Sequence, residues 1–178
     1  IYEAGWMTRE NELLQLAQLY MQRNGAYKGA RIIEKGMEKG FVERNERNYR
    51  LLAQAWIQAQ DDRRSIPPLR EAAQLSNDGQ LYLQLAQSYL NLYEYGDCVE
   101  AARTALRRGG LRRAGYGEVV LGTCLLELKR YEEARDAFSA ARTHDNTRRS
   151  ADRWLEFIDR EVARKRDLDR QLERLQSQ

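Results

Sequence analysis

The chain has 178 residues, 42% of them hydrophobic and 32% charged, so we expect one elongated soluble domain with an apolar core. Its 30 basic and 27 acidic residues give a net charge of +3, which is too balanced to indicate a polyanionic partner. No stretch approaches the roughly 20 apolar residues that cross a bilayer, and no charged and apolar leader precedes a cleavage site. Neither a membrane span nor a signal peptide is therefore expected among these residues.

The same pattern of residues returns four times along the chain. A leucine and a small residue are followed, three positions on, by a large residue, and successive small residues are 36, 33 and 36 positions apart. The four copies are Leu16-Ala17…Tyr20, Leu52-Ala53…Trp56, Leu85-Ala86…Tyr89 and Leu121-Gly122…Leu125. Each copy continues with a small residue, then four positions on a residue that is large in three of the four copies, then three positions further a small one: Gly29, Ile33 and Gly36; Ser65, Leu69 and Ala72; Cys98, Ala102 and Ala105; Ala134, Phe138 and Ala141. Both halves have the i, i+3, i+4, i+7 spacing of an amphipathic helix, so each copy predicts two antiparallel helices.

In chain order, these copies divide the sequence into six segments. Residues 1–9 are interpreted as the tail of a preceding, truncated repeat in a chain cut from a longer protein. Four helical hairpins are then expected, over residues 10–45, 46–78, 79–114 and 115–146. Turns are expected at Asn24-Gly25, Asp61-Asp62 and Tyr95-Gly96-Asp97. Residues 147–178 are expected to form a C-terminal capping helix, begun by Asp145 or Asn146, in which Trp154, Phe157 and Ile158 cover the open end of the fourth hairpin.

Two features depart from this regular pattern. Pro67-Pro68 falls inside the second helix of the second hairpin, which predicts either a late helix start with Ser65 as the cap or a kink. Near the chain end, Leu168, Leu172 and Leu175 form one narrow stripe that is too short to indicate a coiled coil. We expect this part of the capping helix to project.

The sequence offers little to support catalysis. Cys98 and Cys124 are expected to be buried free thiols, because their spacing matches no metal site. A disulfide between them would need the second helix of the third hairpin to lie against the first helix of the fourth, in an oxidising compartment. His144 is expected to be a solvated residue at a helix end. No phosphate loop, nucleophile motif or metal motif occurs, so we predict no enzyme activity, no cofactor and no metal.

The four copies resemble the tetratricopeptide repeat, and Tyr95 and Tyr131 match the aromatic residue that this family places beside the turn. The resemblance implies an all-α fold, a right-handed α–α superhelix of tetratricopeptide-like helical hairpins with a C-terminal capping helix. The segments Ala4-Gly5-Trp6-Met7, Lys39-Gly40-Phe41-Val42 and Gly109-Gly110-Leu111 further resemble bacterial tetratricopeptide proteins encoded beside TonB energy-transduction components. That finer resemblance implies a periplasmic, non-catalytic scaffold that binds components of a TonB-type complex.

In such a superhelix the first helix of every hairpin lines a concave groove, which can hold an extended peptide or a partner helix. Amides dominate this face and can donate to and accept from a peptide backbone, although glutamine is also a good helix former on any wet face. We expect the groove to centre on Arg50, Gln54, Gln87 and Asn91. The full set is Asn11, Leu14, Gln18, Gln22, Arg47, Arg50, Gln54, Gln58, Gln80, Leu83, Gln87, Asn91, Tyr116, Thr123 and Glu127.

A basic cluster lies at the exit of the third hairpin, where Arg107, Arg108, Arg112 and Arg113 have no acid between them. These arginines either offset the dipole of the preceding helix or contact an acidic partner. No aromatic residues interleave with them, so a nucleic-acid partner is not expected. Self-association through the groove or the C-terminal helix stays open. So do two other functions: an assembly factor for another envelope machine, such as pilus or outer-membrane protein biogenesis, and a cytoplasmic regulator.

Overall fold

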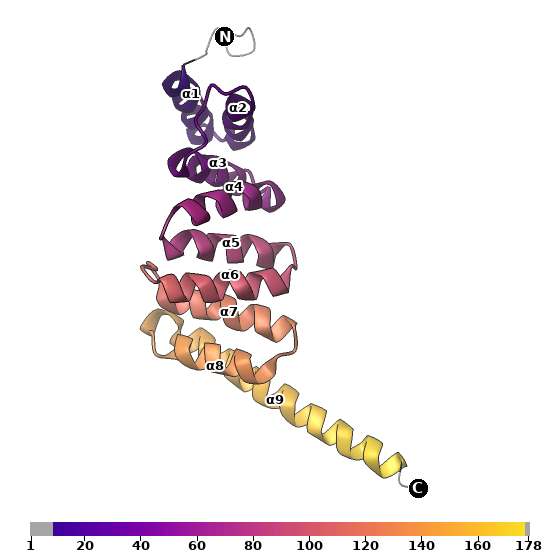
Figure 1. Ribbon diagram of the computed structural model, residues 1–178. Coiled ribbons are helices and arrows are strands. Elements are labelled where there is room, and N and C mark those ends of the chain that lie inside the picture. The colour runs from indigo at the N-terminus through magenta and orange to yellow at the C-terminus, as the bar shows by residue number, and fades with distance from the viewer. Residues whose placement is uncertain (1–8, 177–178) are drawn as a thin grey trace.

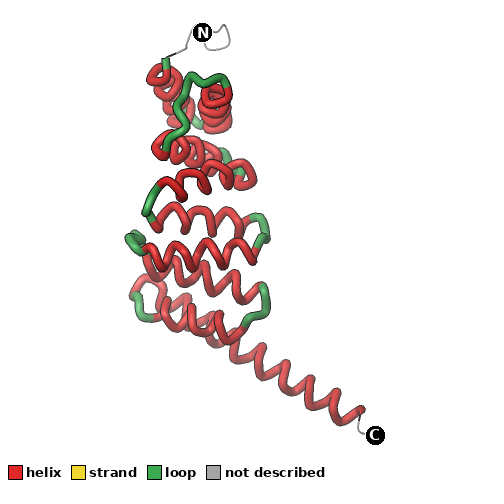
Figure 2. The backbone as a smooth tube through the Cα atoms, in the orientation of Figure 1, coloured by secondary structure: helices red, strands yellow, loops and turns green. Residues whose placement is uncertain are grey.

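The computed structural model describes residues 9–176, and within this range it contains nine helices and no strand. Successive helices run antiparallel and stack in one direction, and the last helix leaves the stack as a long rod (Figure 1). Short loops join the helices throughout (Figure 2). The prediction of an all-α superhelix of hairpins with a C-terminal capping helix is confirmed. The helices are α1 (Glu10–Gln22), α2 (Ala26–Glu38), α3 (Glu46–Gln58), α4 (Asp62–Leu75), α5 (Gly79–Asn91), α6 (Tyr95–Arg108), α7 (Ala114–Glu127), α8 (Tyr131–Arg142) and α9 (Asp145–Gln176).

The predicted tail of a preceding repeat, residues 1–9, lies outside the described residues except for Arg9. From α1 onward the helices form pairs, and α1–α2, α3–α4, α5–α6 and α7–α8 are the four hairpins. Each pair then packs on the next through its second helix, so that α2 contacts α3, α4 contacts α5, and α6 contacts α7. Every first helix after α1 is therefore held between two second helices.

All four hairpins make the same turn after their first helix. One residue per turn, at equivalent positions of the repeat, has a left-handed backbone with φ between 57° and 62°: Asn24, Gln60, Tyr93 and Lys129. The next residue donates its N–H back to the final turn of the helix, over 2.7 to 3.0 Å, as in Gly25 to the Tyr20 carbonyl and Asp61 to the Trp56 carbonyl. This bond satisfies a carbonyl that the helix end would otherwise leave unpaired. The expected turn at Tyr95-Gly96-Asp97 is wrong, because these residues already form the first turn of α6.

Small residues lie where the two helices of a hairpin approach closely. A Cβ added at Gly29 would lie 2.8 Å from the carbonyl oxygen of Ala17, and one added at Gly122 would lie 2.9 Å from the ring of Phe138. Large side chains fill the remaining space, and Trp56 and Phe138 are completely buried.

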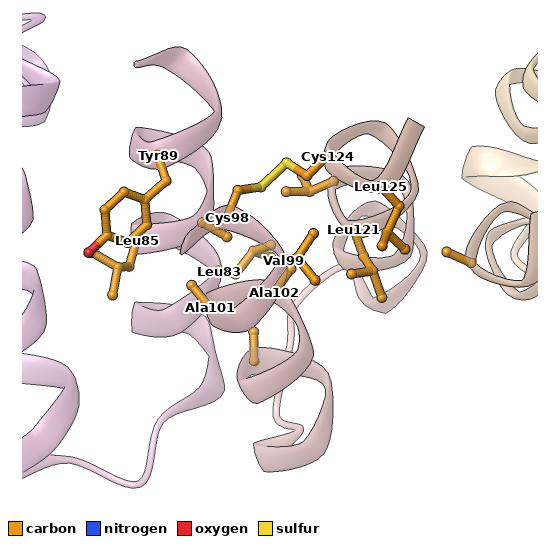
Figure 3. Close-up of a cluster of buried hydrophobic side chains, with 14 of the residues drawn as sticks. Leu83, Leu85, Tyr89, Cys98, Val99, Ala101, Ala102, Leu121, Cys124 and Leu125 are labelled. Atoms are coloured by element: carbon orange, nitrogen blue, oxygen red, sulfur yellow. A yellow bond between two sulfur atoms is a disulfide. The ribbon is translucent and has the colours of Figure 1, made fainter. Parts of the chain in front are cut away.

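The prediction of free thiols is wrong, because Cys98 and Cys124 form a disulfide. The bond joins α6 to α7 across the junction between the third and fourth hairpins, with 6.2 Å between the two Cα atoms (Figure 3). At the preceding junction, the equivalent positions are Ser65 and Ser88, whose hydroxyls are hydrogen-bonded at 3.0 Å. Sequence spacing alone did not reveal the pairing, because it depends on which helices pack together.

Helix α4 does not start late. It begins at Asp62, and the Asp61 carboxylate caps it by accepting a hydrogen bond from the Arg64 N–H at 3.0 Å. Ser65 is therefore not the cap but a buried residue inside the helix. The two prolines follow in the second turn, where they leave the carbonyls of Arg63 and Arg64 without helical donors. Both arginines are exposed, so water can reach this side of the helix.

Helix α9 begins at Asp145, so Asp145 and Asn146 are its first residues and neither is its cap. Trp154 stacks on Phe138 of α8 with 5.6 Å between ring centroids, and Ile158 is completely buried. Phe157 was expected to cover the same end, but it remains 37% exposed. Beyond this region α9 projects, and its three-leucine stripe is exposed: Leu168, Leu172 and Leu175.

Candidate functional site

Two adjoining hollows lie between the parallel first helices α1 and α3. The first has a volume of about 210 Å³ and the second about 340 Å³. Gln18 and Leu51 line both hollows, so the two form one continuous depression, which we call the amide trough. Its lining residues are Asn11, Leu14, Gln15, Gln18, Met21, Gln22, Arg47, Leu51, Gln54 and Gln58.

The helical repeat explains how the sequence builds this trough. On α1 the polar residues Asn11, Gln15, Gln18 and Gln22 recur every three or four positions, so they share one face of the helix. The opposite side of α1 carries the buried Leu13 and Ala17. Because α3 repeats the same arrangement, the two polar faces meet across the trough, and the apolar faces enter the core.

Only one cation of the trough is available to a partner. Arg47 is exposed and has no carboxylate within ion-pair distance among the residues described. Arg50, one turn further along α3, forms ion pairs with Glu46 at 2.6 Å and with Asp78 of the next hairpin at 3.1 Å. Burial lowers the pKa of Arg50, but its hydrogen bonds to the two carboxylates outweigh this effect, and the pKa lies above its ordinary value. Arg50 therefore links two hairpins and is not a free anchor.

The predicted groove residues of the third hairpin bond mainly within the chain. Gln87 donates to Asn91 at 3.0 Å, and Asn91 donates to the Asp62 carboxylate at 2.9 Å. The hydroxyl of Tyr116 donates to the Gln87 carbonyl oxygen. These bonds connect α4, α5 and α7, so they hold neighbouring hairpins together. Of the four residues predicted at the centre of the groove, Arg50, Gln87 and Asn91 make bonds of this kind, and Gln54 makes none with the described residues.

Other predicted groove residues also lie differently from the expectation. Leu14 and Leu83 are only 7% and 3% exposed, so they belong chiefly to the core. Gln80 accepts a hydrogen bond from the Arg112 N–H at 3.3 Å, and Thr123 donates to the carbonyl of Val119 in its own helix. Gln58 lines the trough but donates to the Met21 carbonyl at 3.1 Å. Glu127 is exposed at the end of α7, where it hydrogen-bonds Tyr95.

The predicted set lacks three residues that line the trough, Gln15, Met21 and Leu51. Gln15 could have been found, because it lies one helical turn after Asn11 on the same face. Asp62 was not predicted as a residue of this face, although its carboxylate accepts a hydrogen bond from the Asn91 side chain. That contact joins α4 to α5 across 29 residues of sequence, so local spacing does not indicate it.

The four predicted arginines lie together at the exposed connection between α6 and α7. Arg108 donates to the Asn77 side chain and lies 5.7 Å from the centroid of the Tyr82 ring, and Arg107 donates to the Thr104 hydroxyl. Within the described part of the chain, none of Arg107, Arg108, Arg112 and Arg113 has a carboxylate partner within ion-pair distance. Among the described residues, the side-chain partners of Arg107 and Arg108 are neutral groups: the Thr104 hydroxyl, the Asn77 side chain and the Tyr82 ring.

Among residues 9–176, no group of three or more His, Cys, Asp or Glu side chains is placed to hold a metal ion. In the same range, none of the helices combines the length and the apolar character that crossing a bilayer requires. His144 is half-buried beside Gly115, so it is less solvated than expected. Burial raises the pKa of Glu118 on α7, and the charge of His144 offsets part of that rise.

Solved structures of tetratricopeptide repeat (TPR) proteins share this fold. YrrB, described as a TPR protein with an unusual peptide-binding site, aligns with a TM-score of 0.69 at 14% identity, covering 85% of this chain and 76% of its own. A double mutant of MamA from RS-1 aligns with a TM-score of 0.72 at 13% identity, covering 89% and 85%. The TPR2B domain of yeast Sti1, solved in complex with pHsp70, aligns at 0.58 and 16% identity, covering 65% and 97%.

No family model and no curated protein matches the sequence. The structural similarities, all at low identity, show the fold, which is that of the tetratricopeptide repeats.

Proposed function

We propose that this protein is a non-catalytic scaffold that holds an extended peptide segment of a partner in the amide trough. The observation that carries the proposal is the continuous trough between α1 and α3, lined by exposed amides of which only Gln58 is bonded to another hairpin. Peptide binding by YrrB and the Sti1 complex with pHsp70 give the proposal precedent on the same fold.

The dimensions of the trough define the ligand. Asn11 and Gln22 are three helical turns apart on α1, which corresponds to roughly 16 Å. About five residues of an extended peptide cover that length. Gln18 and Gln54, facing each other from the two helices, can donate to and accept from the peptide backbone without selecting side chains. Arg47 adds one positive charge near the end marked by Asn11, which favours a ligand with a carboxylate at that end.

A selection experiment tests this assignment. The full chain would be used to select binders from a phage-displayed library of 12-residue peptides, and affinities would be measured by fluorescence anisotropy. Replacing Gln18 and Gln54 by alanine is expected to weaken the selected peptides at least tenfold while leaving helicity unchanged. The matched control is Gln74→Ala, which removes an exposed glutamine on α4, away from the trough. Equal binding by both variants would exclude the trough as the site.

The finer assignment concerns the compartment and the partner. We propose a periplasmic protein that binds components of a TonB-type energy-transduction complex, a proposal that comes from the sequence resemblance described above. The buried Cys98–Cys124 disulfide supports the compartment, because disulfides persist in oxidising environments and are rare in the cytosol. The alternatives are an assembly factor for pilus or outer-membrane protein biogenesis and a cytoplasmic regulator.

Site-specific crosslinking distinguishes these partners. A photoreactive amino acid at Gln54 of the intact protein, in its own cell, would capture what lies in the trough. Recovery of TonB-type components supports the finer assignment, and recovery of pilus or outer-membrane assembly proteins favours the alternative. A matched probe at Gln74 identifies nonspecific capture.

The arginine cluster Arg107, Arg108, Arg112 and Arg113 is proposed as a second contact for an acidic segment of the same partner. Its support is the lack of carboxylate partners within the described chain. Charge reversal of Arg112 and Arg113 should weaken capture of the partner more at low salt than at high salt. A salt-independent effect would argue against a charge contact.

A further inference from the structure

The two hollows of the amide trough differ in charge and in size. Arg47 lines the smaller hollow, of about 210 Å³, and no charged residue lines the larger one, of about 340 Å³. Apolar side chains form the floor: Leu14 lies in the smaller hollow and Met21 in the larger, each only 7% exposed. Leu51 is half-buried and lines both hollows, so it lies between them. The trough therefore offers two separate places for side chains of a ligand, one basic and one neutral.

The charge of Arg47 is free to meet an acidic side chain. Two carboxylates at the starts of α1 and α3 are already bonded elsewhere. Glu10 accepts a hydrogen bond from the Asn48 side chain at 2.6 Å, and Glu46 forms an ion pair with Arg50, also at 2.6 Å. In the larger hollow, a polar side chain that reached Met21 and Leu51 would lose its water without gaining a hydrogen bond there. The smaller hollow thus favours an acid, and the larger one a large apolar side chain.

Hydrogen bonds between α1 and α3 hold the trough at both ends. At the end of the smaller hollow, Asn48 of α3 is 2% exposed and donates to Glu10 of α1. At the end of the larger hollow, Gln58 of α3 donates to the Met21 carbonyl of α1 at 3.1 Å. Because the two helices are joined at both ends, the hollows keep a fixed position relative to each other before any ligand binds.

The spacing of the hollows distinguishes two conformations of a bound peptide. Averaged over the lining residues, the two hollows are between five and six positions apart on each helix, which is about 8–9 Å along the helix axes. Side chains on one face of a β-strand recur every two residues, about 7 Å apart, and those of a polyproline II helix every three residues, about 9 Å apart. A peptide that crossed the helices at an angle would need a longer spacing still. Neighbouring side chains of a β-strand are therefore too close together, and those of a polyproline II helix fit.

The amides of the trough suit the backbone of such a helix. A polyproline II helix makes no internal hydrogen bonds, so all its N–H and carbonyl groups need partners when water is displaced. Gln15, Gln18 and Gln22 of α1 and Gln54 of α3 are exposed and can each donate and accept. They therefore provide backbone partners along both sides of the trough.

We propose that the trough binds its peptide as a polyproline II helix, with an acidic side chain in the smaller hollow and a large apolar side chain, three positions away, in the larger one. This inference rests on the peptide-binding function proposed above and adds the conformation and the sequence of the ligand to it.

The phage selection described above tests the spacing. Selected peptides that bind the Gln18→Ala, Gln54→Ala variant at least tenfold more weakly are ligands of the trough, and their sequences are compared with the unselected library. A pair of Asp or Glu with Leu, Ile, Met or Phe should be enriched at least fivefold at a separation of three positions, and less at two or four. No enrichment, or equal enrichment at two positions, would overturn the inference and leave the proposed function standing. Binders that ignore Gln18 and Gln54, as expected if another part of the chain or a second copy fills the trough, would overturn both.

Proline substitutions in a selected peptide test the conformation. Proline fixes φ near −65°, which is close to the value in a polyproline II helix and far from that in a β-strand. Proline at the two positions between the anchors should keep the Kd, measured by fluorescence anisotropy, within about threefold. Glycine at the same positions should weaken binding, because it leaves the free peptide more flexible. A tenfold loss with proline would overturn the conformation.

A charge exchange tests the place of the acid. Arg47→Glu should weaken a selected peptide at least tenfold, and replacing the acid of the peptide by lysine should restore the Kd to within about threefold. The matched control is Arg44→Glu, which makes the same charge change at an exposed arginine that lines neither hollow. Circular dichroism of both variants checks that they are folded. Equal losses for the two variants, or no recovery with lysine, would show that the acid does not meet Arg47 and would overturn the inference.

Discussion

Removing the Cys98–Cys124 disulfide is expected to lower the free energy of unfolding by about 3.5 kcal/mol at 25 °C. The two cysteines are 26 positions apart, and the bond closes a loop of that length in the unfolded chain. The loss of chain entropy in this loop accounts for the whole figure. Both cysteines are completely buried at the α6–α7 junction, so their replacements must also fit there (Figure 3).

The structure itself suggests the replacement. Ser65 and Ser88 occupy the equivalent positions of the preceding junction and form a hydrogen bond there. The double variant Cys98→Ser, Cys124→Ser should therefore rebuild a serine pair and keep the native packing. The remaining difference from the oxidised protein is then the constraint on the unfolded state. The urea m-value should rise slightly, because an unfolded chain without the loop exposes more surface.

The assay is urea unfolding followed by circular dichroism, without reductant, for the natural chain and the double variant. Alkylation of the natural chain before and after reduction, read by mass spectrometry, provides the control for bond formation. A double variant within about 1 kcal/mol of the oxidised protein would refute the loop-entropy reasoning. Alkylation of both cysteines before reduction would refute the bond itself.

The remaining predictions concern two glycines and one carboxylate. Gly79→Ala should destabilise the chain by about 1–3 kcal/mol, because the added Cβ would lie 2.3 Å from the Gly109 carbonyl oxygen. Gly96 is also in a helix, but a Cβ added there would have nothing within 4 Å, so Gly96→Ala should stabilise the chain by about 0.5–1 kcal/mol. Thermal unfolding of both variants checks this pair, and equal shifts would contradict it. Burial raises the folded-state pKa of Glu118 above its ordinary value of 4.5, so the folded chain binds this proton more tightly than the unfolded chain, and stability is lost as pH rises through the folded pKa. Glu118→Gln should therefore raise the urea midpoint at pH 7 but not near pH 3.5, where the Glu118 carboxyl is mostly protonated in both the folded and the unfolded chain. A difference in midpoint that does not depend on pH would contradict the raised pKa of Glu118.

Much of the fold could be predicted from local spacing. Small residues such as Ala17 and Gly122 have apolar residues three and four positions away in the same helix. This spacing predicts the buried face of each helix without knowledge of the hairpin that packs against it. The turn geometry was harder to predict, because Gln60, Tyr93 and Lys129 adopt left-handed backbones that these residue types do not favour. In α4, the Asp61 carboxylate caps the helix four residues before the expected cap Ser65, so the prolines fall in its second turn.

The sequence by itself determined the helical hairpins, their order and the polar face on which the candidate site lies, because these depend on residues within about one helical turn of each other. Only the tertiary structure decided which polar side chains are bonded to another hairpin and that the Cys98 and Cys124 sulfurs form a disulfide. Gln54 and Asn91 occupy equivalent faces of their helices, yet Asn91 is bonded to Asp62 of another hairpin while Gln54 lines a trough. Such bonds join residues that are far apart in the chain, and the packing of whole helices brings them within reach.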